Sequence, residues 1–312
     1  MPAAAWAESL DQMPAGLFVG LLTLDIVQWV QRLPRPNEKM VSSSVDVAAG
    51  GPATNAAVTF AALGGTPTLL TALGASAVRP VIVDELTRHC VDVVDSAAPE
   101  HPGPAISAVN IVVGTGERSV VSRNAEQARI DAPEHLPDLI EGTQVVLIDG
   151  HLPALASAAV DAASSMRTPV VLDGGSWKAT VAELLPRIEA AVCSADFAVP
   201  GCTSVEASAR ALLKTGVRFV AFTDGPRPVR WWTEHGSGAV DVASVTATDT
   251  LGAGDAFHGA FAFAIAGGED PVGALRFAAD VAAVRVQHAG PRAWLSDPRL
   301  PELVAASRHR PA

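Results

Sequence analysis

Residues 249–257 read Asp-Thr-Leu-Gly-Ala-Gly-Asp-Ala-Phe, and this stretch indicates the fold and the chemistry more strongly than any other. Two glycines flank an alanine, an aspartate follows at once, and the sequence then becomes apolar and helix-prone. This order predicts a helix whose first backbone N–H groups point into one small volume. Unpaired N–H groups and the helix dipole attract anions to such a terminus. Asp255, in the first turn, would hold a carboxylate beside the bound anion.

A base beside an anion hole is what transfer of a phosphoryl group to a hydroxyl requires. We expect Asp255 to accept the proton of the attacking hydroxyl, since an unperturbed aspartate, with a pKa of about 3.9, is ionised at neutral pH. Gly252, Ala253 and Gly254 would offer backbone N–H groups to the transferring phosphoryl, where large side chains would block its approach. The alternative is a plain glycine turn before a helix that carries an acid early.

A second glycine motif lies about two hundred residues upstream, where residues 50–57 read Gly-Gly-Pro-Ala-Thr-Asn-Ala-Ala. Together and in this order, the two motifs resemble those of the ribokinase-like (PfkB) carbohydrate kinases. The resemblance extends from about Leu17 to about Pro301. It implies an α/β three-layer sandwich with a mainly parallel central sheet, plus a small β-strand lid that often pairs with a second subunit. A homodimer is therefore expected.

The resemblance also implies an activity, the ATP-dependent phosphorylation of a primary hydroxyl of a small sugar with the help of Mg²⁺. It assigns Asp25, Gly50, Gly51 and Asn55 to sugar binding. Asp25 could also be only a polar strand end, and the two glycines only a tight turn before a helix. The motif lacks the lysine of typical ribokinases, which favours a ketohexose-type sugar over ribose by a small margin.

On the nucleotide side, the resemblance assigns Thr223 and Gly225 to the loop that contacts the phosphates of ATP. Relatives carry a second glycine three residues on, whereas this chain has Pro228. Glu206 matches the glutamate that orders the water shell of magnesium, although the asparagine that usually precedes it is absent. Glu206 could equally be an early-helix acid favoured by the helix dipole.

Asp249 has two interpretations. In many relatives this position helps to build a site for a monovalent cation such as K⁺ beside the anion hole. It could equally be a loop aspartate that bonds its own backbone. Lys178 is a candidate partner for phosphate or simply a solvated lysine.

Composition supports a folded globular protein. Of the 312 residues, 49% are apolar and 18% are charged, which argues against disorder. The net charge of −11 has no basic cluster set against it, so we expect no nucleic-acid partner. The three cysteines predict buried thiols in a reducing, cytoplasmic setting. Residues 47–78 carry no charge, but their glycines and prolines argue against a membrane span.

Strands and helices are predicted to alternate after residue 144, which favours a parallel sheet covered by helices. The predicted elements are strands at 17–22, 68–73, 106–113, 118–122, 144–148, 170–172, 217–222, 229–232 and 239–245, and helices at 54–63, 79–90, 154–166, 181–190, 205–214, 253–266, 272–287 and 301–308. Segments 36–48 and 105–124 interrupt the alternation and match the lid. We expect a flexible tail over residues 1–15, with Met13 as a candidate start, and one kinase domain over residues 16–308.

Two other functions fit parts of the sequence. A nucleoside kinase of the same fold would need a flat apolar slot for a base, and the chain has no tyrosine to build one. A catalytically silent sugar sensor would explain the missing asparagine and Pro228, but not the intact glycines around Asp255. No P-loop, complete dinucleotide fingerprint or Gly-x-Ser-x-Gly elbow occurs in the sequence.

Overall fold

The computed structural model describes residues 13–122 and 130–307. Within them, a central sheet has the strand order β13-β12-β11-β10-β9-β8-β1-β4-β5. Seven of its strands run parallel, and they are β1 (Ala15–Val19), β4 (Thr66–Thr71), β5 (Asp92–Asp95), β8 (Val145–Ile148), β9 (Val170–Gly174), β10 (Ala190–Ser194) and β11 (Phe219–Asp224). An antiparallel hairpin, β12 (Arg227–Trp232) and β13 (Ser237–Val240), closes one edge.

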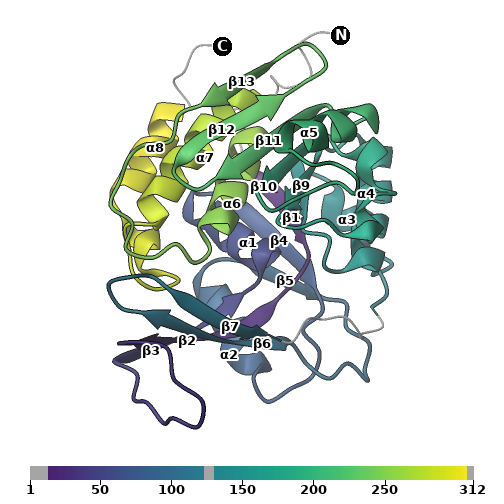
Figure 1. Ribbon diagram of the computed structural model, residues 1–312. Helices are drawn as coiled ribbons and strands as arrows, with labels where there is room; N and C mark the ends of the chain where they lie inside the picture. The colour runs from purple at the N-terminus through teal and green to yellow at the C-terminus, as the bar shows by residue number, and fades with distance from the viewer. Residues whose placement is uncertain (1–12, 123–129, 308–312) are drawn as a thin grey trace.

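Helices cover both faces of this sheet, so the molecule has three layers (Figure 1). One face carries α1 (Pro52–Ala62), α2 (Arg79–Arg88), α6 (Ala253–Ala266), α7 (Pro271–Arg285) and α8 (Arg299–Ser307). The other carries α3 (Leu136–Ile140), α4 (Pro153–Met166) and α5 (Val205–Lys214). The predicted α/β sandwich with a mainly parallel sheet is confirmed.

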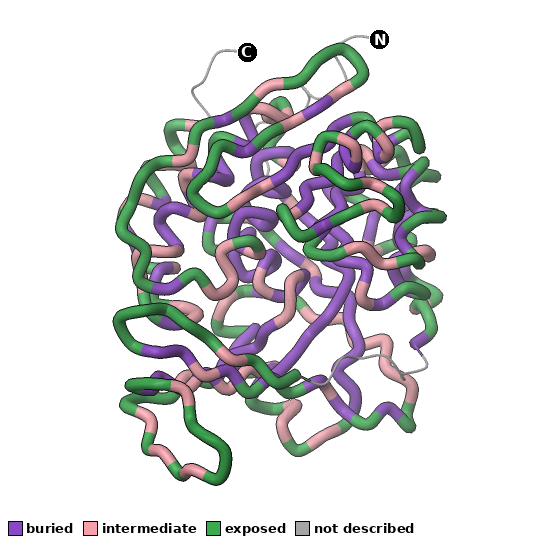
Figure 2. Tube along the Cα trace, in the orientation of Figure 1, coloured by how far each residue is buried: buried purple, intermediate pink, exposed green. Residues whose placement is uncertain are grey.

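Alternation along each strand supplies the two cores. Phe18 of β1 packs into the core under α1 and α6, whereas its neighbours Leu17 and Val19 pack into the core under α4. Helix α6 is apolar almost all round, and every residue from Ala256 to Ile265 is buried. Figure 2 shows these strands and α6 as a continuous buried interior.

A second, smaller sheet of order β3-β2-β6-β7 lies below the sandwich in the view of Figure 1. Its strands are β2 (Thr23–Val30), β3 (Ser44–Gly50), β6 (Ala105–Val112) and β7 (Arg118–Ser122). It contains the expected segments 36–48 and 105–124 in part, although residues 123 and 124 lie outside the described residues. Strand β2 was not predicted as a separate element, because the apolar run that begins at Leu17 continues into it after a break of three residues.

The helix expected over residues 181–190 is wrong. The structure has two short 3₁₀ turns, Ala179–Val181 and Leu185–Arg187, followed by strand β10. Pro186 explains the difference, because a proline inside a helix lacks the N–H that the helix needs and clashes with the preceding turn. The short elements β5 and α3 were also not predicted.

Other expectations are settled only in part. Strand β1 begins at Ala15, the last residue of the expected tail, and residues 1–12 lie outside the described part of the chain. Of the three free cysteines, Cys193 is buried, Cys202 is half-buried and Cys90 is exposed, so the expectation of buried thiols holds for one. Among the described residues, no helix has the length and apolar character needed to cross a bilayer.

Candidate active site

The carboxyl ends of the parallel strands carry a row of polar side chains. Asp149 follows β8, Asp173 stands near the end of β9, and Thr223 stands near the end of β11. In open α/β sheets, ligands bind outside this edge. His258 of α6 lies against it, with Nε2 3.0 Å from the carbonyl oxygen of Val192 and Nδ1 3.3 Å from Oδ2 of Asp173. The first turn of α6 is thereby held over the edge where ligands are expected.

The first turn of α6 has the open backbone geometry that its sequence predicts, and its anion-binding role stays a prediction. Gly252 caps the helix with a φ of 70°, in the left-handed region that favours glycine. A Cβ at Gly254 would meet open space, so a ligand can approach the backbone there. The N–H of Ala253 turns back to the carbonyl of Thr250 at 3.3 Å. The N–H groups of Gly254 and Asp255 belong to the first turn, where a helix provides no acceptor of its own.

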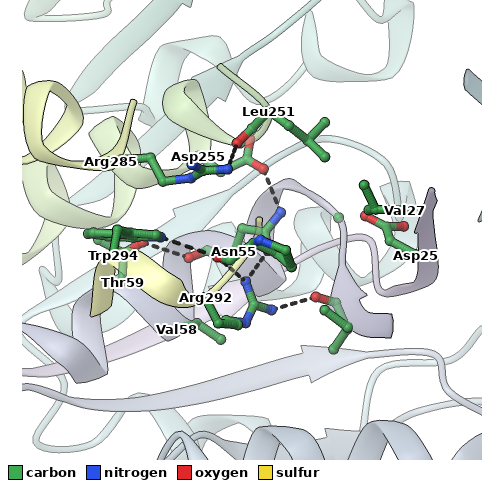
Figure 3. A pocket seen from close by; sticks show the side chains of 15 residues that line it. Asp25, Val27, Asn55, Val58, Thr59, Leu251, Asp255, Arg285, Arg292 and Trp294 are labelled. Carbon is green, nitrogen blue, oxygen red and sulfur yellow. Dashed lines mark hydrogen bonds between the residues drawn. The ribbon is translucent and has the colours of Figure 1, made fainter. Parts of the chain in front are cut away.

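Asn55 joins the two glycine motifs. Its amide Nδ2 donates to Oδ2 of Asp255 at 2.7 Å, and its Oδ1 accepts from Nη1 of Arg292 at 3.1 Å (Figure 3). Burial raises the pKa of Asp255 above its ordinary value, while the hydrogen bond from Asn55 favours the ionised carboxylate and opposes that rise. The carboxylate is therefore a stronger base than an exposed aspartate, yet it is oriented by a donor.

Asp25 faces the same cavity from the small sheet. Its Oδ1 accepts from the hydroxyl of Thr23 at 2.6 Å, and burial is the main cause that raises its pKa. Gly50 makes room for it, because a Cβ at that position would lie 2.0 Å from Oδ2 of Asp25. Gly51 has a φ of 98°, and a Cβ there would lie 2.2 Å from the carbonyl oxygen of Leu21. Each position of the pair therefore requires glycine for a different steric reason.

One cavity therefore brings together most of the predicted catalytic and sugar-binding residues. Its wall includes Asp25, Gly51, Asn55, Gly252 and Asp255. Figure 3 labels three of these residues, Asp25, Asn55 and Asp255. The small sheet closes one side of it, and the inner face of that sheet packs on Leu251, the residue before the helix cap.

Arg292 is part of the site and was missed by sequence reasoning. Besides Asn55, it donates from Nε to Oε1 of Glu85 at 2.7 Å and from Nη2 to the carbonyl of Ala49 at 2.5 Å. It therefore ties α1, α2 and β3 together in the wall of the cavity. The available signal was a lone arginine in an apolar loop, Gly-Pro-Arg-Ala-Trp over residues 290–294, which does not specify its partners.

Asp149 was also missed. Its Oδ2 accepts from the N–H of Leu21 at 2.8 Å and from the N–H of Ala53 at 3.2 Å, so it fixes the start of α1 against the end of β1. This explains why a carboxylate follows the buried run of residues 145–148.

The predicted nucleotide-binding residues lie at the end of β11, on the same edge of the sheet. The hydroxyl of Thr223 donates to the carbonyl of Cys193 at 3.4 Å, and Gly225 turns the chain with a φ of 55°. The β11–β12 register shifts between Phe222 and Asp224, and Pro228 follows within the antiparallel hairpin. Neither Thr223 nor Gly225 is among the residues that line the cavity, and their role stays a prediction.

Glu206 stands apart from the cavity, in the first turn of α5. Its carboxylate is exposed and pairs with Arg210 four residues on, at 2.8 Å. No cluster of three or more metal-binding side chains occurs among the described residues. Mg²⁺ commonly keeps its waters and is held by substrate phosphates with one or two carboxylates, and the exposed carboxylate of Glu206 is of the type that could serve.

Asp249 is engaged on both carboxylate oxygens. Oδ1 accepts from the N–H of Leu251 at 2.9 Å, which is the local backbone bond of a loop aspartate. Oδ2 accepts from Nη2 of Arg285 at 3.1 Å and from the N–H of Gly290 at 3.1 Å. A buried guanidinium thus occupies the position at which the resemblance expects a monovalent cation.

A three-layer α/β fold whose sheet edge carries an anion-binding helix start, with a carboxylate beside it, defines a phosphotransferase-type enzyme. Residues 16–298 match the model of the pfkB family carbohydrate kinases, and the chain belongs to that family of kinases. It is 28% identical over 278 residues to the ribokinase of Bacillus subtilis (strain 168), and the match covers 86% of this chain and 91% of that protein. It is 26% identical over 298 residues to the ribokinase of Staphylococcus aureus (strain COL), covering 89% and 95% of the two chains.

Solved structures agree with the fold. A crystal structure described as that of a candidate ribokinase from Agrobacterium tumefaciens has a TM-score of 0.82 and 26% identity, and the match covers 95% of this chain and 98% of that one. The Arabidopsis thaliana ribokinase complexed with ribose and ATP has a TM-score of 0.76 at 20% identity, covering 96% and 100% of the two chains.

Proposed function

We propose that this carbohydrate kinase transfers the γ-phosphoryl group of ATP to a primary hydroxyl of a small sugar of the ribose or ketohexose type. The observation that carries the proposal is the position of Asp255. Its carboxylate lies in the first turn of α6, beside backbone N–H groups, and lines one cavity with Asp25 and Asn55. A base, an anion hole and a hydroxyl-binding carboxylate are thus assembled in one place.

The reaction follows from these groups. Asp25 accepts hydrogen bonds from sugar hydroxyls and holds the ring in place. The oxygen of the primary hydroxyl attacks the γ-phosphorus, its proton passes to Asp255, and the bond between the γ-phosphorus and the bridging oxygen breaks to release ADP. The N–H groups of Gly254 and Asp255 stabilise the charge on the transferring group. The small sheet excludes water that would otherwise accept the phosphoryl group.

The relatives support ATP as the donor, since one structural neighbour was solved with ribose and ATP and another with ATP and magnesium. We place the nucleotide along the carboxyl edge of the sheet, at Thr223 and Gly225, with Lys178 near its phosphates. Lys178 lies close to the edge residues, since a Cβ at Gly150, which follows Asp149, would be 3.4 Å from its Cδ. Magnesium would neutralise phosphate charge, with Glu206 ordering its waters after release from Arg210.

The sugar is the open part of the proposal. The curated relatives are ribokinases, which favours ribose, whereas the absence of a lysine from the Gly50–Asn55 motif favours a ketohexose. The test is ADP release from ATP and Mg²⁺ with ribose, fructose, tagatose, sulfofructose, 2-keto-3-deoxygluconate or adenosine as the acceptor. Turnover on adenosine alone would favour a nucleoside kinase.

The control variant is Asp255→Asn, which keeps the shape of the side chain but removes the base. We expect it to bind the sugar and to lose turnover by several orders of magnitude. Asp241→Asn, at an exposed position away from the cavity, serves as the matched control and should retain full activity. Near-normal turnover in Asp255→Asn would contradict the role of Asp255. Sugar binding without turnover by the unmodified protein would establish a sensor.

We further propose that the protein is a homodimer formed through the small sheet. The strand register puts Asp25, Ala48 and Ser107 on the face toward the cavity. The opposite face exposes four large apolar side chains, those of Val45, Val47, Ile106 and Val121. An apolar face of this kind on a soluble protein marks an interaction site.

Light scattering during gel filtration tests this interface. The double variant Val47→Asp with Val121→Asp should elute as a monomer, while Val81→Asp, at an exposed valine of α2, should remain a dimer. A monomeric unmodified protein at micromolar concentration would contradict the proposal.

No nucleic acid or membrane takes part in this function, and the free thiols suit a cytoplasmic enzyme.

A further inference from the structure

Arg285, the last residue of α7, is buried at the edge of the active site with a relative exposure of 2%. A buried arginine is rare unless its charge and its N–H groups are matched. Figure 3 shows its guanidinium beside Leu251 and Asp255. Neither glycine motif includes it, and the proposed reaction gives it no role.

Four oxygen atoms surround this guanidinium. Nη2 donates to Oδ2 of Asp249 at 3.1 Å and to the carbonyl of Leu251 at 2.5 Å. Nη1 donates to the carbonyl of His288 at 2.9 Å and, more weakly, to the carbonyl of Asp249 at 3.4 Å. One carboxylate oxygen and three backbone carbonyls therefore converge on a single positive charge.

This oxygen set is the kind that binds a potassium ion, because carbonyl oxygens can replace the hydration shell of K⁺. In this chain the space between the oxygens is taken by a side chain. Burial lowers the pKa of Arg285, but Asp249 opposes the change and an arginine stays protonated in proteins. The positive charge at this place is therefore permanent and covalently attached.

We propose that the guanidinium of Arg285 replaces the monovalent cation of this kinase family, so that the enzyme needs no K⁺. The charge acts at the right place, since Arg285 lines the cavity with Gly252 and Asp255. By holding the carbonyl of Leu251 and the carboxylate of Asp249, it fixes the loop from which the helix cap at Gly252 begins. Arg285 is thus a positioning residue for the anion hole.

The inference rests on the proposed kinase activity only for its turnover readout. The first experiment compares the unmodified protein in KCl, NaCl and tetramethylammonium chloride at equal ionic strength, after exhaustive removal of K⁺. We expect the same thermal midpoint and a turnover that differs by less than about twofold among the salts. Thallium(I), an NMR-active substitute for K⁺, should show no saturable binding. A thermal shift specific to K⁺, saturable thallium binding, or strong activation by K⁺ would overturn the proposal.

The binding and thermal readouts need no substrate, so a failure to find the sugar would leave them decisive.

The second experiment uses Arg285→Met, which removes the charge but keeps much of the volume. We expect turnover in tetramethylammonium chloride to fall by at least about tenfold and K⁺ to recover part of it. Arg276→Met, at an exposed arginine of the same helix, should behave as the unmodified protein. An unchanged turnover in Arg285→Met would also overturn the proposal.

A third variant covers the case in which Arg285→Met fails to fold. Arg285→Lys keeps a positive charge with three donors, so turnover should persist without K⁺ and should not respond to it. Activation of Arg285→Lys by K⁺ would show that charge at this position is not what the site requires. A purely structural role for Arg285 predicts lower stability in both variants with no difference between K⁺ and tetramethylammonium.

Discussion

The side-chain amide of Asn55 donates to the carboxylate of Asp255 across 2.7 Å, two hundred positions further along the chain. Through this bond Asn55, which is predicted to bind the sugar, also acts on Asp255, which is predicted to accept the proton of the sugar hydroxyl. Burial raises the pKa of Asp255, and the bond from Asn55 lowers it. Because a general base must be ionised, turnover should fall as the pH drops through this pKa.

Replacing Asn55 by alanine should therefore move the acid limb of the turnover profile to higher pH. The reason is that the ionised form of Asp255 loses a hydrogen bond while its burial remains. The measurement is turnover against pH at saturating sugar, with Asp241→Ala, at an exposed position away from the cavity, as the control. An acid limb that stays in place, or moves to lower pH, would show that the bond does not tune the base.

Gly50→Ala should weaken sugar binding specifically. Its new Cβ would lie 2.0 Å from Oδ2 of Asp25, so the carboxylate must leave its position in the cavity. We expect the KM for sugar to rise by at least about tenfold, with a much smaller change in the KM for ATP. Steady-state kinetics with each substrate varied in turn give both values. Gly236→Ala, where a Cβ meets open space, is the control, and equal effects of the two changes would refute the steric argument.

Arg292→Met should destabilise the protein as a whole. The change leaves Glu85 buried without its charged partner, which costs about 3–5 kcal/mol when one side of a buried ion pair is removed. Urea unfolding measures this loss. Adding Glu85→Gln should restore part of it, because the uncompensated charge disappears. By comparison, Arg88→Met breaks only an exposed pair with Asp84 and should cost no more than about 1 kcal/mol.

Asp173→Asn should stabilise the protein, and more so as the pH rises. Burial raises the pKa of Asp173 to about 6 from an ordinary 3.8. The folded protein then binds more protons than the unfolded chain between these values, so its stability decreases as the pH rises through them. Asparagine avoids this loss, which corresponds to about 3 kcal/mol near neutral pH.

Unfolding free energies of both proteins from acidic to neutral pH provide the check for Asp173. The difference between them should be small at the acid end and should reach a plateau above the raised pKa. Asp196→Asn, at an exposed position nearby, should show no such growth. A difference that does not change with pH would mean that the carboxylate of Asp173 is not held neutral by burial.

Much of the fold was predictable because its signals are local. Helix α5 begins at Val205 and ends at Lys214 as expected, since Ser204 caps it and the apolar positions repeat with helical spacing. The alternation of apolar strands with helices also predicted the parallel sheet. Strand β2 was not predicted because its buried residues continue those of β1. The chain passes from one sheet to the other between them, and the composition does not change at that point.

The site was predictable in its motifs and not in its connections. Asp255, Asn55 and Asp25 were each named from short patterns, and the cavity unites them. Arg292 and Arg285 were missed because their roles depend on partners distant in sequence, Glu85 and Asp249. A lone arginine in an apolar segment indicates that an acidic partner must match its charge, but the neighbouring residues in the sequence do not identify that partner.

The strand order of the central sheet has a consequence for synthesis. Strand β1 lies between β4 and β8, and its second neighbour is completed only at Ile148. During synthesis, strand β1 therefore waits for this neighbour, with Leu17 and Val19 unburied on one face, until residue 148 has been made. Parallel pairing of this kind is slow and exposes apolar surface to other chains. Until then, this segment is a place on the nascent polypeptide where aggregation can begin.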